Sequence, residues 1–178
     1  MLWYYCDNET GAILTGGLSP NEETAKKNSE LTPEGAGFYM VPDGSVSNMF
    51  EGTPDFSVLQ NDLCNRIDRE AGELRALFIT DVPGQPQTYE RKEREARAWT
   101  PESDPENFPF MTAEADERGI DIAVVQAEIM QQVETLIPLA ARVEGRRIAT
   151  KERIMKSTTL PGIISAYKVD WSFDTPSS

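Results

Sequence analysis

A long apolar stripe at helical spacing runs through the last third of the chain. Between Asp121 and Lys156, apolar residues recur every three or four positions, as one buried face of an α-helix requires. The stripe consists of Ile122, Val125, Ile129, Val133, Leu136, Ala140 and Val143. Asp121 is a favourable N-cap, and Ile120 is spaced from Val125 as in a hydrophobic staple. The pattern therefore predicts a helix over 121–156 that packs side by side with others, and Pro138 predicts a kink or a split one turn earlier.

Two more segments have helical periodicity. Leu59, Leu63 and Ile67 lead a pattern with four- and seven-residue spacings, which predicts a helix over 57–79 that Pro83-Gly84 ends. Residues 87–99 are rich in Glu, Arg, Lys and Ala, and predict a second helix that Thr100-Pro101 stops. We expect these helices and the 121–156 helix to bury their apolar faces against one another as a bundle.

The chain ends predict β-structure. LWYY and AILTGG flank the turn DNETG, and GFYMV and SVSNMF flank Pro42-Asp43-Gly44, so two hairpins are expected. The polar stretch between them reads as a loop with one helical turn, and LPGIISAYKVDWSF alternates as a final strand would. The expected fold class is α+β: an N-terminal β-hairpin region, a helical bundle with a long kinked helix, and a C-terminal strand. The expected domains are 1–54, 55–156 and 157–178.

Residue types restrict the chemistry. The chain has no histidine, which removes His-dependent triads and HExxH zinc sites. Cys6 and Cys64 could pair with each other, but two small buried thiols are favoured. No phosphate-binding glycine loop is present, and no acidic cluster matches a calcium loop. We therefore expect no catalytic residue, cofactor or metal.

The net charge is −13 and is unevenly distributed. Residues 1–120 hold 23 acids and 10 bases, whereas residues 121–178 hold seven of each. This balance argues against nucleic-acid binding, and no apolar run is long enough to span a membrane. The basic run of Arg142, Arg146, Arg147, Lys151, Arg153 and Lys156 could bind phosphate. The favoured interpretation is a helix end that complements acidic parts of this chain or of a neighbouring subunit.

Residues 82–154 resemble a helical module of tailed-bacteriophage tail-fibre and tail-fibre-assembly proteins. The likeness lies in PGQPQTYERKEREARAW, in the aromatic connector NFPF, in the turn AEADERGI, and in the long helix with paired alanines before its basic end. It implies a non-enzymatic structural protein of the virion tail, made in the bacterial cytoplasm, as a tail-fibre, baseplate or connector component. The alternative is a tail-fibre assembly chaperone that the mature virion does not retain.

The expected partners are other phage tail proteins and further copies of the chain, with a trimer favoured. Four aromatic residues are predicted as anchors in the bundle or at an interface: Tyr89, Trp99, Phe108 and Phe110. From the long stripe, the predicted packing positions are Ile122, Ile129, Leu136 and Val143. An enzyme is the least favoured reading, because the sequence nominates no convergent set of polar residues.

Overall fold

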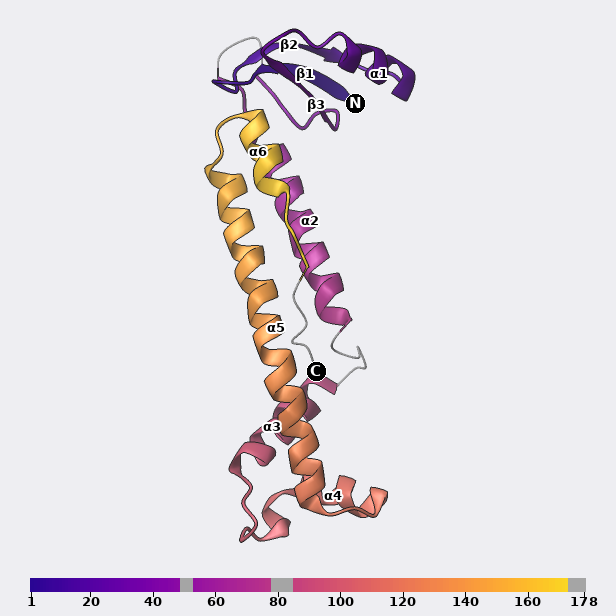
Figure 1. The fold of residues 1–178 in the computed structure, drawn as a ribbon, viewed down its shortest axis with the longest axis vertical. Helices are drawn as coiled ribbons and strands as arrows, with labels where there is room; N and C mark the ends of the chain where they lie inside the picture. The colour runs from indigo at the N-terminus through magenta and orange to yellow at the C-terminus, as the bar shows by residue number, and fades with distance from the viewer. Residues whose placement is uncertain (49–52, 78–84, 173–178) are drawn as a thin grey trace. The chain divides into compact units, whose positions relative to one another are not determined.

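The computed structural model describes residues 1–48, 53–77 and 85–172 (Figure 1). They form two compact units, one drawn from Met1–Ala71 and Gly145–Ser178 and the other from Gly72–Glu144. A three-stranded sheet precedes a series of helices, so the α+β class is confirmed. The elements are β1 Leu2–Asp7, β2 Ile13–Leu18, α1 Glu22–Glu30, β3 Ala36–Val41, α2 Ser57–Ala76, α3 Gln85–Ala98, the short 3-10 helix η1 Pro105–Asn107, α4 Pro109–Arg118, α5 Ile122–Lys156 and α6 Leu160–Tyr167.

The sheet is antiparallel, with β1 between β2 and β3. The first predicted hairpin is confirmed, because β1 pairs with β2. The second is wrong: β3 pairs with β1, and residues 45–48 form no strand and take part only in an isolated bridge between Ser47 and Asp55. Residues 49 and 50 of the predicted hairpin lie outside the described residues. Pairing with β1 places Phe38 opposite Tyr5, and these rings cluster with Trp3 on one face of the sheet.

Glycines in the strands make room for aromatic rings. A Cβ at Gly16 would lie 2.4 Å from the Tyr4 ring, which crosses from the neighbouring strand. A Cβ at Gly17 would lie 3.0 Å from the Trp3 ring, since successive residues point to opposite faces. The paired glycines therefore let β1 fold a large ring over β2 on each face of the sheet.

Helix α1 replaces the loop that we expected between the first two strand regions. Its nine residues begin after Asn21, whose side-chain oxygen accepts a hydrogen bond from the Thr24 amide at 2.9 Å. This cap, with two acidic residues in the first turn, favours a helix longer than one turn. The Tyr5 hydroxyl donates to the Asn28 carbonyl and ties α1 to the sheet.

The first unit has one apolar core, which we call the sheet core. It combines one face of the sheet with apolar residues of α2, α5 and α6: Tyr4, Cys6, Val41, Leu59, Leu63, Cys64, Ile67, Ile154, Leu160 and Ile163. The predicted face of α2 is therefore correct at its first three positions, while residues 78 and 79 of the predicted helix lie outside the described residues. Both cysteines are buried free thiols, as favoured, and burial raises the pKa of Cys6 to about 11.

The predicted C-terminal strand is wrong, because its first half forms α6. The Thr159 side chain caps this helix, and Pro161 lies in its first turn, where a missing amide costs nothing. Leu160 and Ile163 are both buried, at helical spacing. Leu160, Ile163, Ile164 and Tyr167 recur at spacings of three and four residues, which fit the helical period of 3.6. The Thr159 cap and the early proline favour a helix over a strand. Residues 168–172 continue without regular secondary structure.

The second unit is helical. One face of α3, α4 and the first turns of α5 enclose a separate cluster, the helical core, whose buried members are Ala96, Phe108, Met111, Ala115 and Val125. The segment AEADERGI, expected as a turn, instead contains the last turns of α4, which ends at Gly119 in the left-handed conformation. A left-handed glycine after the last helical turn is a common helix end. The turn signal in this sequence therefore belongs to Gly119 alone, and the residues before it are helical.

Helix α5 is continuous from Ile122 to Lys156. The Asp121 side chain accepts a hydrogen bond from the Ala123 amide at 2.7 Å, which confirms the predicted N-cap. The helix also continues through Pro138, so the predicted split is wrong, while the kink stays a prediction. Proline removes one backbone hydrogen bond but does not by itself end a helix of this length.

Candidate functional site

The predicted anchors fall into two groups in the second unit. Phe108 is buried in the helical core, and Trp99, Ile122 and Ile129 pack against that core while partly exposed. These four residues therefore act together. Trp99 follows the last turn of α3 and Phe108 precedes α4, so their contact with the core fixes the connector between the two helices.

The other predicted anchors lie elsewhere. Phe110 is partly exposed, and the Arg91 guanidinium lies 5.7 Å from the centre of its ring, within cation–π range. Tyr89 leaves 43% of its surface in solvent. On α5, Val143 is fully buried and Leu136 is partly exposed. The eight predicted anchor and packing positions thus lie in different environments, from the buried helical core to the exposed surface.

A second feature of α5 is an apolar segment, residues 136–141, with the sequence LIPLAA. Six consecutive apolar residues cover every side of a helix, because one turn takes 3.6 residues. A helix that is apolar all round is normally enclosed by protein. Here none of the six residues is buried, and Ile137 is 47% exposed. The apolar segment is therefore a candidate contact surface for another polypeptide.

Charged residues that the sequence analysis did not single out position α4. Oε2 of Glu95, on α3, accepts hydrogen bonds from the Phe110 and Met111 amides, both at 3.0 Å. These amides belong to the first turn of α4, where helix geometry leaves them without an internal partner. Phe108, at the N-cap position, makes no side-chain cap, so Glu95 supplies that function from another helix. No local spacing rule reveals such a contact.

A chain of ion pairs continues along this unit. Lys92 on α3 pairs with Glu114 on α4, and Arg118 bridges Glu114 and Glu128 on α5 at 2.9 and 2.7 Å. The hydrogen bond from Lys92, followed by that from Arg118, lowers the pKa of Glu114 below its ordinary value. Three helices are thereby joined through charges at the edge of the helical core.

In the first unit, α2 holds the basic half of α5. Asp68 accepts hydrogen bonds from Arg147 and Lys151, each at 2.6 Å. Nε2 of Gln60 donates to the carbonyls of Ile154 and Ser157, at the end of α5. Part of the basic run thus complements an acidic residue of the same chain, as the favoured interpretation expected.

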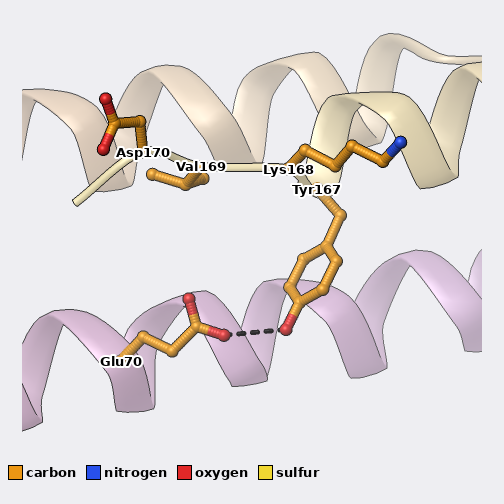
Figure 2. Close-up of a pocket in the computed structure, with 5 residues that line it drawn as sticks. All are labelled: Glu70, Tyr167, Lys168, Val169 and Asp170. Carbon is orange, nitrogen blue, oxygen red and sulfur yellow. Dashed lines mark hydrogen bonds between the residues drawn. The ribbon is translucent and has the colours of Figure 1, made fainter. Parts of the chain in front are cut away.

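The segment after α6 is attached to α2 through Glu70. Figure 2 shows the Tyr167 ring reaching across to this carboxylate, one oxygen of which accepts a hydrogen bond from the Tyr167 hydroxyl at 2.7 Å. The other oxygen accepts a hydrogen bond from Nε1 of Trp171 at 2.8 Å. The hydrogen bond to Glu70 raises the pKa of Tyr167, because a carboxylate favours the protonated phenol. These residues border an open cavity of about 520 Å³, lined by Glu70 and residues 167–170.

A second cavity, of about 390 Å³, lies between α5 and the same segment. Three cations line it, Arg146, Arg153 and Lys168, together with one carboxylate, Asp170. We call it the basic cavity. Nη1 of Arg146 also donates to the backbone carbonyls of Asp170 and Ser172, so this side chain holds the segment in place.

Within the described residues, no group of three or more His, Cys, Asp or Glu side chains is arranged to hold a metal ion. No helix in this part of the chain is long and apolar enough to cross a membrane. Comparisons with protein-family models, with curated proteins and with solved structures found no match to the chain.

Proposed function

We propose that the chain is a non-enzymatic structural protein of a bacteriophage tail, acting through oligomerisation and partner docking. The observation that carries this proposal is the apolar segment of α5, residues 136–141, in which no residue is buried. Contact with another chain would remove this surface from water, and each buried methylene contributes about 0.8 kcal/mol to such a contact. The resemblance of residues 82–154 to phage tail modules supports the tail as the place of assembly.

The helical core gives the apolar segment a rigid base. Val125 and its neighbours fix the first turns of α5 against α3 and α4. The ion pairs of Arg118 restrain the same turns from outside. A preformed helix loses little conformational freedom when it docks, which favours association. Other tail proteins and further copies of the chain are the proposed partners, with a trimer favoured.

Genetic complementation tests the proposal. Deleting the gene from the phage that encodes the chain should give particles with an incomplete tail, visible by negative-stain electron microscopy. Ile137→Asp should fail to restore the tail, because a charge would enter the proposed contact. Glu134→Gln, a substitution of an exposed residue one turn earlier, should restore it. A complete tail in the deletion mutant would overturn the proposal.

An assembly chaperone would also be needed for a complete tail. The two roles differ in the finished particle, which keeps a structural component and lacks a chaperone. Complementation therefore establishes that the chain acts in the tail, and the content of purified particles distinguishes the two roles.

A further inference from the structure

The second unit carries uncompensated negative charge over residues 102–117, which we call the acidic segment. It contains six acidic residues and no basic residue. Glu114 is neutralised by Lys92 and Arg118. The other five are exposed and have no cationic partner among the described residues: Glu102, Asp104, Glu106, Asp116 and Glu117. The acidic segment is thus free to attract a basic surface.

The basic cavity of the first unit has the opposite character. Its lining includes Arg153 and Lys168 and one carboxylate, that of Asp170, which accepts a hydrogen bond from the Ser172 amide at 2.8 Å. Neither Arg153 nor Lys168 has a carboxylate partner among the described residues. Both side chains are exposed. In a chain of net charge −13, this is a local excess of positive charge.

The shape of the cavity allows another chain to approach. Along α5 it is lined by three small residues, Gly145, Ala149 and Thr150. Nη2 of Arg153 donates to the Thr150 hydroxyl at 2.9 Å, which restrains the guanidinium beside α5. The remaining guanidinium donors of Arg153 are available to a carboxylate, a group that arginine binds with two parallel hydrogen bonds.

We propose that the basic cavity of one copy binds the acidic segment of a second copy. This inference rests on the proposed function, because it names the surfaces through which copies associate. Charge complementarity selects the occupant: the acidic segment presents five exposed carboxylates without a cationic partner, and the basic cavity presents Arg153 and Lys168 without a carboxylate partner, among the described residues.

The contact has a direction, because two different surfaces of the chain meet. Two copies can form this contact reciprocally about a two-fold axis, so that each basic cavity binds the partner's acidic segment. Formed once per pair, the contact joins copies head to tail. It closes into a ring when the rotation between copies allows, and otherwise continues as a filament. A closed oligomer, either a two-fold pair or a larger ring, is therefore the expected product.

Sedimentation velocity of the full chain, at about 20 mM and 500 mM NaCl, tests the contact. We expect association at low salt that weakens at high salt, because salt screens exposed charges. Reversing the cavity with Arg153→Glu and Lys168→Glu should lower the association constant at least about tenfold. Reversing the acidic segment with Glu102→Lys and Glu106→Lys should have a similar effect.

Mixing the two doubly substituted chains is the most specific test of the contact. Each then presents a surface complementary to the other, so the equimolar mixture should associate although neither variant does alone. Matched controls on α1, Lys26→Glu with Lys27→Glu and Glu22→Lys with Glu23→Lys, change the net charge equally. They should leave association within about twofold of the unsubstituted chain.

Three results would overturn the inference. If the chain associates but neither reversal weakens it, copies meet through another surface, and the proposed tail function stands. If the unsubstituted chain stays monomeric at both salt concentrations, the inference also fails, while the tail function is judged separately by complementation. If calorimetry detects inorganic phosphate binding that needs Arg153 and Lys168 in a monomer, the cavity is a small-anion site instead.

Discussion

The carboxylate of Glu95 on α3 accepts a hydrogen bond from the backbone amide of Met111 on α4, at 3.0 Å. The same oxygen accepts from the Phe110 amide, so one side chain satisfies two donors of the first turn. Charge-assisted bonds of this kind, at a helix N-terminus, are among the stronger polar contacts in proteins. Glu95 therefore links the position of α4 to that of α3.

Replacing Glu95 with Ala should destabilise the second unit by about 1–2 kcal/mol, the usual cost of losing an N-cap. Hydrogen exchange of residues 109–118 measures the change where it occurs. The matched control is Glu93→Ala, which removes only a pair with Arg97 within one helix. Equal protection of α4 in both variants would show that Glu95 does not cap it.

Replacing the predicted anchors with alanine should lower the free energy of unfolding by different amounts. Phe108→Ala removes a buried ring from the helical core and should cost about 3–5 kcal/mol, whereas Tyr89→Ala should cost less than about 1 kcal/mol. Trp99→Ala should lie between them, because Trp99 is only partly buried. Urea denaturation of the three variants measures this order, and a large loss on removing Tyr89 would contradict it.

The strand glycines allow a comparison between two Gly→Ala substitutions. At Gly16 the new Cβ would lie 2.4 Å from the buried Tyr4 ring, and we expect a loss of about 1–3 kcal/mol from overpacking. At Gly72 nothing lies within 4 Å of the new Cβ, and the residue is inside α2. There the substitution should stabilise by about 0.5–1 kcal/mol. Thermal unfolding of both variants checks the opposite signs.

The pair of cations on Asp68 predicts a pH dependence. The hydrogen bond from Lys151, and then that from Arg147, lowers the pKa of Asp68 below its unfolded value of about 3.9. Because the folded pKa is the lower one, the contribution to stability is complete above about pH 4 and is lost as the pH falls through the folded pKa. Asp68→Asn should therefore destabilise the chain at pH 7.

The difference in unfolding free energy between Asp68→Asn and the unsubstituted chain should shrink as the pH falls from about 4 to 2. Asp62→Asn is the control, since within the described residues Asp62 makes only an exposed pair with Arg66 on the same helix. A difference that stays constant across this range would contradict the account of Asp68.

Local signals predicted the long helices, and contacts between distant residues set the rest. Asp121 and the apolar stripe are sufficient to predict α5, because the capping residue directly precedes the residues that repeat at helical spacing. The pairing of β3 with β1 depends on Phe38 meeting Tyr5, 33 positions away, and no local spacing reveals it. Glu70 and Glu95 were two carboxylates among thirty acidic residues, distinguished only by the donors that the fold brings to them.

We propose that this chain is a structural part of a phage tail, and the finished particle should therefore contain it. Quantitative mass spectrometry of gradient-purified particles can count copies of the chain against a shell protein of known number. We expect a fixed copy number, as a small multiple of three or six. If the chain is present in the infected cell and absent from the particle, the structural role is wrong and the chain is an assembly factor.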